Sequence, residues 1–406
     1  MFAKRPPIIA FAPHPWWSHW LSRQQLLTRL GQRGWPIIYS FGPLDFWDRH
    51  LPLWQQSPWR GRIQFQDHVW VEHPGRLLPI WSKFPAWDRY VIRRHALSLK
   101  QALAAHGGAD KAVALLFHPA FQSWLKWLQP GQVAYHIYDT YNMMEEWSPE
   151  MAAREAALVS SARLITTSSA GMAANLPGDG PRRARVLNNG ADSELFLNGA
   201  GARCPADLAA IPHPRIGYVG AINAKLDLEM VLSVSQKRPE WHWVFLGHIR
   251  MNGQSAEAGQ VRDRWAQLLT RNNVHYLGQK PREQMPAYVN NMDALTICYK
   301  IARLDQGEAA SWVVHGYPTK LHEFLATGLP VVAGPQQVIV DDFSHVVRVA
   351  ADSAQWEASL AEALLQGGVG TPAARQQVAL ANTWDKRVDL LEGWLEEMTG
   401  PPSVLS

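Results

Sequence analysis

The chain has 406 residues, of which 47% are apolar and 18% charged, a composition typical of globular proteins that excludes an intrinsically disordered one. Two domains are expected at this length, because a single hydrophobic core rarely grows so large. Two widely separated cysteines match no metal site or disulfide framework, and no run of 18 apolar residues is present to span a membrane.

Basic residues and tryptophans are concentrated in the first third of the chain. Residues 1–130 carry 16 Lys or Arg against 6 Asp or Glu, and they hold 12 of the 20 tryptophans. A basic, Trp-rich surface suits anionic lipid headgroups or an acidic acceptor, so an anionic membrane surface is an expected partner. No recognised nucleic-acid motif accompanies the charge, so nucleic acid is not an expected partner.

The first half of the chain alternates apolar runs, which predict strands, with segments of helical periodicity. The expected strands are 7–12, 36–40, 63–65, 68–71, 112–117, 133–138 and 163–167, and the expected helices are 21–30, 89–103, 121–128, 151–160 and 170–176. This order predicts a parallel sheet of the Rossmann type. No G-x-G-x-x-G follows the first strand, which argues against a nicotinamide dinucleotide.

Two polar residues of this half lie at the carboxyl ends of expected strands. Asp139 comes just after the strand 133–138, and His118 comes just after the strand 112–117. Ligands of open parallel sheets bind beyond these ends, so both side chains are expected to face a ligand, and no other carboxylate of this half is expected there. Asp139 can act as a general base or cap the following turn, and His118 is the second candidate base.

The second half begins after a segment containing Gly, Ala and Pro, residues 198–214, which is expected to be a linker. The expected strands are 215–219, 243–246, 274–277, 294–298 and 329–333, and the expected helices are 227–236, 285–292, 318–326 and a terminal helix from 382. This alternation predicts a second Rossmann-like domain. The backbone N–H groups of Gly220 and Ala221, with the start of the next helix, are expected to hold a diphosphate.

The most informative stretch is YPTKLHEFLATGLPVVAGP, residues 317–335. Pro318 favours a first helical turn, Gly328 a helix end, and the apolar run after it a short buried strand. Lys320, with Thr319 beside it, can assist anion binding at the helix start, and the Glu323 carboxylate can accept from a ribose diol. The alternative is an ordinary helix–strand unit with a solvated Lys and Glu.

The pattern P-x-K-x-x-E-F-L-A-x-G-x-P-V-V in this stretch resembles the nucleotide-sugar motif of GT-B glycosyltransferases, especially the family 4-like group that builds bacterial surface polysaccharides. The pair Arg23-Gln24, the Tyr-Asp of YDTYN and the segment NNGAD…F at 188–196 resemble the same family. The resemblance covers nearly the whole chain and implies two Rossmann-like domains facing a cleft. Residues 1–197, with a helix at 383–398 that crosses back onto them, would bind the acceptor, and residues 213–382 the nucleotide sugar.

The resemblance also implies roles for single residues of the second domain. Lys320 would bind the donor diphosphate and Glu323 the ribose. Lys225 is the one cation in a loop where relatives carry an Arg and a Lys. Gly278 and Gln279 occupy the turn whose backbone receives the base.

Two further positions follow from the resemblance. His315 stands where many relatives carry a second glutamate, which changes the expected donor contacts on that side. Asp139 lies where related enzymes keep a catalytic His or Asp.

The implied activity is metal-independent hexosyl transfer from a nucleotide-diphosphate sugar, a co-substrate rather than a cofactor, to a lipid-linked or polysaccharide acceptor. The absence of an Asp-x-Asp motif for a divalent metal agrees with it. The expected location is the cytoplasm, at the inner face of the cytoplasmic membrane.

Two other functions fit the same residues. A sugar-nucleotide epimerase of this fold also binds a diphosphate, but it needs further acid and base groups and no large acceptor surface. A non-catalytic carbohydrate-binding protein is favoured by His315 and by the few cations near Gly220. Fold class alone does not decide between them.

Overall fold

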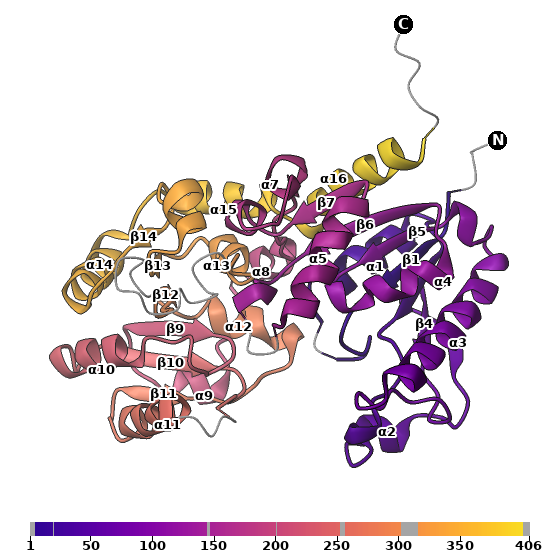
Figure 1. The fold of residues 1–406 in the computed structure, drawn as a ribbon. Coiled ribbons are helices and arrows are strands. Elements are labelled where there is room, and N and C mark those ends of the chain that lie inside the picture. Colours follow the sequence, from indigo (N-terminus) through magenta and orange to yellow (C-terminus); the bar gives the residue numbers. More distant parts are fainter. Residues whose placement is uncertain are drawn as a thin grey trace, which may run out of the picture. The chain divides into compact units, whose positions relative to one another are not determined.

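The computed structural model describes residues 5–18, 20–143, 147–199, 201–251, 256–301 and 316–400. The chain divides into two compact units, drawn in Figure 1. The first unit comprises Met1–Asn188 and Arg387–Ser406, and the second comprises Asn189–Lys386. No helix among the described residues is long and apolar enough to cross a membrane.

The first unit is built on an eight-stranded sheet with the order β3-β4-β2-β1-β5-β6-β7-β8. Its strands are β1 (Ile8–Phe11), β2 (Ile37–Ser40), β3 (Arg62–Gln66), β4 (Val69–His73), β5 (Val113–Leu116), β6 (Gln132–Ile137), β7 (Leu164–Thr167) and β8 (Arg185–Val186). Only the β3–β4 pair at one edge is antiparallel. The strand order reverses at β1, which pairs with β2 on one side and β5 on the other. Ligands of such sheets bind at this reversal.

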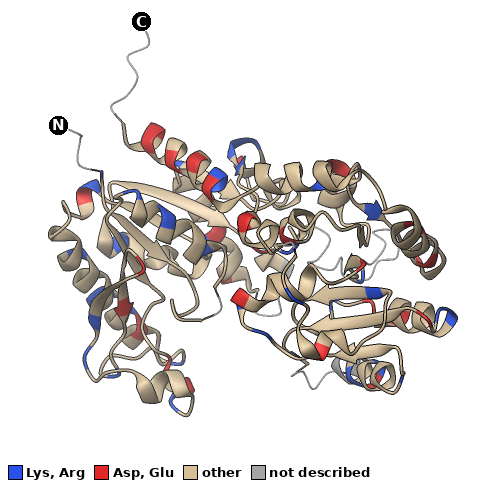
Figure 2. Ribbon diagram, turned by 180° about the vertical axis from the view of Figure 1, so that it is seen from behind, with Lys and Arg blue, Asp and Glu red and all other residues tan. Residues whose placement is uncertain are grey.

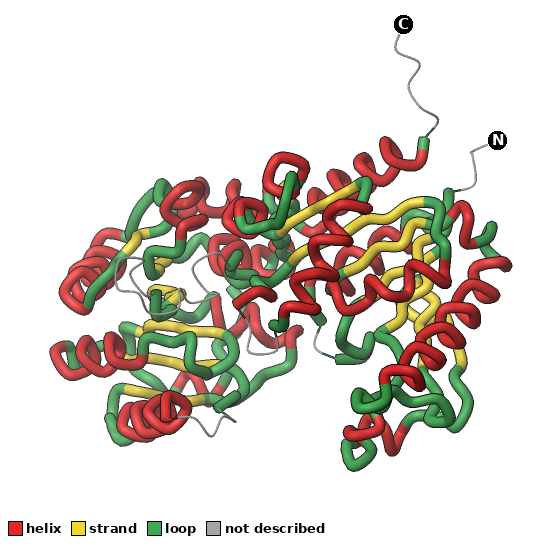
Figure 3. The backbone as a smooth tube through the Cα atoms, in the orientation of Figure 1, coloured by secondary structure: helices red, strands yellow, loops and turns green. Residues whose placement is uncertain are grey.

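Helices surround this sheet, which is yellow in Figure 3. Every residue of β1 and β5 is buried, as expected for parallel strands covered on both faces. The helices are α1 (Ser22–Gln32), α2 (Pro52–Gln56), α3 (Pro85–Ala104), α4 (Leu125–Leu128), α5 (Pro149–Ser161), α6 (Ala170–Ala174), α7 (Gly180–Arg183) and the C-terminal α16 (Trp384–Thr399).

The second unit contains a six-stranded, all-parallel sheet with the order β11-β10-β9-β12-β13-β14. Its strands are β9 (Arg215–Val219), β10 (His242–Leu246), β11 (Val274–Tyr276), β12 (Ala294–Ile297), β13 (Val331–Ala333) and β14 (Arg348–Val349). Its helices are α8 (Ser193–Leu197), α9 (Ala206–Ala209), α10 (Leu228–Lys237), α11 (Ala256–Leu269), α12 (Met285–Val289), α13 (Leu321–Ala326), α14 (Ser353–Gln366) and α15 (Pro372–Ala381). The predicted pair of Rossmann-like sheets is therefore confirmed.

Some boundaries differ from expectation. The segment expected to be a linker contributes Leu208 and Ile211 to the core of the second unit. The helix expected from Pro318 begins at Leu321, because residues 319 and 320 form a turn. Helices α11, α14 and α15 were not predicted, although α14 and α15 carry capping residues: Asp352 accepts from the Ala354 N–H, and Thr371 accepts from the Ala374 N–H.

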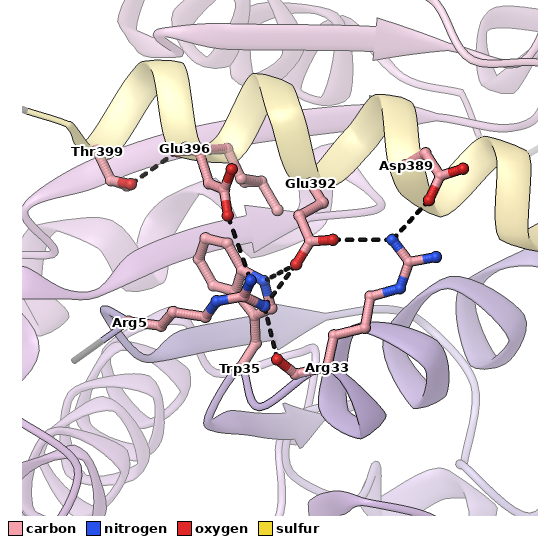
Figure 4. A network of polar contacts seen from close by, with 8 residues as sticks. Arg5, Arg33, Trp35, Asp389, Glu392, Glu396 and Thr399 are labelled. Carbon is pink, nitrogen blue, oxygen red and sulfur yellow. Dashed lines mark hydrogen bonds and ion pairs between the residues drawn. The ribbon is translucent and has the colours of Figure 1, made fainter. Parts of the chain in front are cut away.

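The C-terminal helix packs onto the start of the chain, as predicted (Figure 4). The Glu392 carboxylate accepts from Arg33 at 2.8 Å and from the Trp35 indole at 3.0 Å, and it pairs with Arg5. Arg33 also pairs with Asp389 at 2.8 Å. Acidic residues recur along α16, red in Figure 2, and complement these arginines. Apolar packing accompanies the ion pairs, since Val388, Leu391 and Leu395 of α16 are buried.

Candidate functional site

Glycines follow three neighbouring strands of the second sheet at their carboxyl ends. Gly220 follows β9, Gly247 follows β10 and Gly278 lies just beyond β11, with φ angles of 141°, 145° and 74°. The Gly247 N–H donates to the Gly278 carbonyl at 2.9 Å, and a Cβ on Gly247 would lie 2.0 Å from the Gly220 carbonyl oxygen. The glycines let the backbone segments at this edge pack closely, and the position of a Cβ on Gly278 has no protein atom within 4 Å.

Lys320 reaches this edge from the turn before α13. Its ammonium group donates to the Tyr299 hydroxyl at 3.0 Å and to the Tyr218 hydroxyl at 3.3 Å. The same nitrogen lies 5.1 and 4.5 Å from the centroids of these two rings. A Cβ on Gly220 would lie 2.4 Å from Lys320 Nζ and would displace the ammonium group, and the φ of 141° also favours glycine there.

The ammonium group of Lys320 is a buried charge surrounded by neutral groups. Burial lowers its pKa to about 8, although Cys298 and Glu323 act in the opposite direction. Burial also raises the pKa of Tyr218 and of Tyr299, which keeps both hydroxyls neutral. Within the described ranges, no carboxylate lies at ion-pair distance from Lys320. A buried cation without a counter-ion is an arrangement that favours an anionic ligand.

Lys225 lies close to the same cluster. Its Nζ is 4.9 Å from the centroid of the Tyr299 ring, which Lys320 also faces. Some of the backbone N–H groups expected to bind diphosphate here already have protein partners. The Gly220 N–H donates to the Leu246 carbonyl, and the start of α10 is capped by the Asp227 carboxylate, which accepts from the Met230 N–H at 2.9 Å. Gly220 therefore contributes to the site by lacking a side chain, which leaves room for the Lys320 ammonium group.

Glu323 lies in the first turn of α13 and belongs to a charged group of three residues. Its carboxylate accepts from Arg282 at 3.1 Å, and the same guanidinium nitrogen donates to Asp192 at 2.7 Å. Burial raises the pKa of Glu323, and the Arg282 charge opposes this shift. Arg282 was not singled out from the sequence, because no local pattern connects it with residues 41 and 90 positions away.

The remaining predicted donor residues contribute less to this geometry. Thr319 is exposed in the turn before α13, and Gln279 is exposed beyond Gly278. His315 lies outside the described residues. In the part of the chain that the structure describes, no three His, Cys, Asp or Glu side chains are grouped so that they could hold a metal ion.

In the first unit, Asp139 lies two residues beyond β6. One of its carboxylate oxygens accepts from the Thr140 N–H at 2.9 Å, the contact expected of a turn cap. It lines a hollow of about 20 Å³, with room for about one water molecule. Glu155 of α5 lines the same hollow, and burial raises its pKa. A second carboxylate of this unit therefore lines the hollow beside Asp139.

His118 lies at the end of β5 and caps the following turn. Its Nδ1 accepts from the Ala120 N–H at 3.1 Å. Burial, with a contribution from His14, lowers the pKa of His118 to about 4, so the ring is neutral at pH 7. A neutral imidazole that accepts at Nδ1 carries its proton on Nε2. His118 is thus arranged as a hydrogen-bond donor, which disfavours it as the base.

Arg23 provides a buried positive charge at the same edge of the first sheet. Its guanidinium donates to the Tyr39 hydroxyl and to Ser18 Oγ, both at 3.2 Å, and Tyr39 donates to the His14 carbonyl. The neighbouring Gln24 donates to the Trp16 carbonyl at 3.1 Å. The pair noticed in the sequence therefore holds the loop after β1 in place.

Two Rossmann-like parallel sheets in one chain define the GT-B class of fold. HepE of Anabaena, in complex with UDP and glucose, superposes with a TM-score of 0.64 at 13% identity, covering 97% of this chain and all of that one. Sucrose-phosphate synthase from Thermosynechococcus elongatus superposes with a TM-score of 0.66 at 14% identity, covering 97% of this chain and 99% of that one. At these identities the likeness concerns the fold alone.

Residues 211–373, within the second unit, match the family described as glycosyl transferases group 1. This part of the chain therefore belongs to the group 1 glycosyl transferase family, as its motifs had indicated. TuaH of Bacillus subtilis strain 168, provisionally named a teichuronic acid biosynthesis glycosyltransferase, is 25% identical over 267 residues. That match covers 62% of this chain and 63% of TuaH, less than two thirds of that relative's length.

Proposed function

We propose that the protein transfers a sugar from a nucleotide-diphosphate sugar to a lipid-linked or polysaccharide acceptor. The observation that carries this proposal is the buried ammonium group of Lys320, held against Gly220 without a counter-ion among the described residues. A diphosphate supplies the missing negative charge. The same ammonium group would stabilise the charge that develops on the leaving diphosphate during transfer.

The donor that we propose is a uridine-diphosphate sugar, bound by the second unit. HepE is described with UDP and with UDP-glucose, which makes UDP-glucose the first compound to test. Lys320 would bind the diphosphate with Lys225 as a second cation. Glu323 would accept from the ribose, oriented by Arg282, and the row of glycines would let the nucleotide approach the backbone at the strand ends.

For the acceptor we propose a chemical class rather than a single compound, and we propose that the first unit binds it. The name of TuaH refers to teichuronic acid biosynthesis, which supports a cell-surface polysaccharide or its lipid-linked precursor. We propose Asp139 as the general base that accepts the proton of the acceptor hydroxyl, with His118 as a hydrogen-bond donor beside it. The basic, Trp-rich first third of the chain supports action at the cytoplasmic face of an anionic membrane.

A screen of nucleotide sugars by thermal unfolding tests the donor site. UDP-glucose is expected to raise the Tm of the wild type, because a ligand that binds only the folded state stabilises it. Lys320→Ala should remove most of this rise. Lys237→Ala is the matched control, since Lys237 lies at the far end of α10 and pairs with Glu357. No rise with any nucleotide sugar, or an equal rise in Lys320→Ala, would refute the proposed site.

Product analysis separates transfer from the two other functions. Incubation with the donor alone should leave the sugar unchanged, whereas an epimer in the product would identify an epimerase. Nucleotide-sugar binding without transfer to any acceptor fraction, including membrane extracts, would favour a binding protein.

A further inference from the structure

A cavity of about 710 Å³ opens in the first unit between the β3–β4 ribbon, helix α3 and the segments before and after the ribbon. Its volume is within the range of small-molecule sites, roughly 300–1,000 Å³. All of its lining residues belong to the first unit, and none of them is Asp139, His118 or Arg23. It is therefore separate from the residues considered so far.

The lining carries an excess of positive charge. Arg60, Arg62 and Arg94 line the cavity and are exposed, and none of their side chains forms an ion pair or hydrogen bond with any residue in the described ranges. Glu72 is the one acidic residue among the lining side chains. Three guanidinium groups against one carboxylate favour a ligand with negative charge.

The single carboxylate is already satisfied by the protein. His95 Nε2 lies 2.8 and 2.9 Å from the two oxygens of Glu72, and His95 Nδ1 lies 2.8 Å from the Trp124 indole nitrogen. An indole nitrogen only donates, so Nδ1 accepts, Nε2 carries the proton, and His95 donates to Glu72. This pair anchors α3 to β4, so among the described residues Glu72 pairs with His95 and not with the three arginines.

Large apolar side chains line the same cavity. Trp59, Leu77 and Leu78 are 65%, 54% and 37% exposed and are grouped around this one cavity. Exposed Phe84 and Trp87 follow closely at the start of α3. A small phosphorylated sugar would leave this apolar surface in water, whereas a hydrocarbon chain would cover it. Arginine beside tryptophan and leucine is typical of protein surfaces that meet lipid headgroups.

We propose that this cavity binds a lipid phosphate: a phosphate group held by Arg60, Arg62 and Arg94, with the first part of its hydrocarbon chain against Trp59, Leu77 and Leu78. Two sources share this chemistry, a phospholipid of the bilayer and the lipid phosphate of a lipid-linked acceptor. Binding itself does not depend on the proposed transfer reaction. Only the assignment of the lipid as an acceptor rests on the proposed function.

Titration of the full-length protein with decyl phosphate below its micellar concentration tests the site. Decyl phosphate should bind at least tenfold more tightly than inorganic phosphate or decanol, because only decyl phosphate has both a phosphate group and a hydrocarbon chain. Arg94→Gln should weaken binding about fivefold, the usual effect of one basic residue at a lipid surface. Arg93→Gln is the matched control: Arg93 is the preceding residue of α3, and its guanidinium lies over Trp127, 5.1 Å from the ring centroid.

Equal losses in Arg94→Gln and Arg93→Gln would overturn the proposal, because they would indicate diffuse attraction to a basic surface. Equal affinity for inorganic and decyl phosphate would also overturn it, since the apolar wall would then have no role. Leu77→Ser, with Leu97→Ser on the outside of α3 as its control, should lower affinity for decyl phosphate and not for inorganic phosphate. Circular dichroism establishes that each variant is folded.

Two further arms distinguish the sources of the lipid. A bilayer site predicts that Arg94→Gln lowers flotation with phosphatidylglycerol vesicles and leaves KM for a soluble acceptor unchanged. An acceptor site predicts a raised KM for a saccharide linked to a lipid phosphate. Decyl phosphate is titrated without nucleotide sugar, so the two proposals are tested independently. Absence of decyl phosphate binding would not count against the donor site, and absence of nucleotide-sugar binding would not count against the lipid phosphate site.

Discussion

The substitution Lys320→Met measures how much the buried ammonium group lowers the free energy of unfolding. Methionine has a similar length and carries no charge, so the cluster can close around it with little strain. Tyr218 keeps a partner, because its hydroxyl also donates to the Ala221 carbonyl at 3.1 Å. Without nucleotide sugar, we expect Lys320→Met to be more stable than the wild type at pH 7.

The expected gain follows from the pKa of Lys320. Burial lowers it from 10.5 to about 8. At about 1.36 kcal/mol for each pH unit, this shift corresponds to ~3 kcal/mol. The variant also loses the cation–π interactions with Tyr218 and Tyr299, which costs roughly 0.5–2 kcal/mol. The expected net gain in the free energy of unfolding is therefore about 1–3 kcal/mol. For a unit of about 200 residues, Tm should rise by roughly 2–4 °C for each kcal/mol.

The pH dependence has a definite sign. The folded state holds the Lys320 proton less tightly than the unfolded state, so the penalty is fully present below pH 8. Between about pH 8 and 10.5 the folded protein releases this proton first, and the wild-type free energy of unfolding rises relative to that of the variant. The difference between the two proteins should therefore shrink across this window and vanish above it.

Urea unfolding at pH 7 and at pH 10 measures this difference. Lys237→Met is the control for loss of a lysine, and because Lys237 is exposed it should stay within about 0.5 kcal/mol of the wild type at both pH values. Saturating UDP-glucose should reverse the order of wild type and Lys320→Met, because the bound diphosphate would supply the missing negative charge. A less stable Lys320→Met at pH 7, or a difference independent of pH, would refute the reasoning.

Three further predictions concern other residues. Glu323→Gln should raise the KM for UDP-glucose more than it lowers kcat, because a ribose contact acts equally in ground and transition states, and an unchanged KM would argue against that contact. Asp139→Asn should lower kcat by roughly 10²–10⁴-fold in transfer assays, whereas His118→Ala should cost less; the reverse order would assign the base to His118. Glu392→Gln should destabilise the protein by about 1–3 kcal/mol at pH 7, through the lost hydrogen bonds of a charged group, and an unchanged urea midpoint would contradict this.

The destabilisation by Glu392→Gln should depend on pH. Burial works against the Glu392 carboxylate, but hydrogen bonds from Arg33 and Trp35 and the charge of Arg5 outweigh it and lower its pKa. The stabilisation is therefore present above the ordinary glutamate pKa and is lost as the pH falls through the lower, folded-state value. Wild type and Glu392→Gln should converge in stability under those acid conditions.

Arg282 connects two motifs that the sequence presents separately. One motif contains Asp192 and the other contains Glu323, and the guanidinium group donates to both carboxylates. If Glu323 binds ribose, Arg282 orients the carboxylate, and its charge opposes the rise in the Glu323 pKa that burial causes. We therefore regard Arg282 as a positioning residue of the proposed donor site, since it holds a residue proposed to touch the ligand.

Much of the fold could be predicted because its signals are local. A parallel strand covered on both faces must be apolar along its whole length, so β1, β5, β9 and β12 are visible as short apolar runs. The stretch 317–335 was recognisable for the same reason, since its turn, helix, glycine and strand follow one another directly. Helices α14 and α15 were missed despite capping residues at Asp352 and Thr371 that were equally local.

The sequence determined that Gly220 follows a strand and that Lys320 and Glu323 lie at the start of a helix, because these positions follow from order along the chain. Only the tertiary structure decided that Lys320 is buried among two tyrosines and has no counter-ion in the described part of the chain. Tyr218 lies 102 positions from Lys320, and the protonation of a buried group depends on what surrounds it in space. The tautomer of His118 was decided in the same way, by a backbone N–H whose position depends on the fold of the turn.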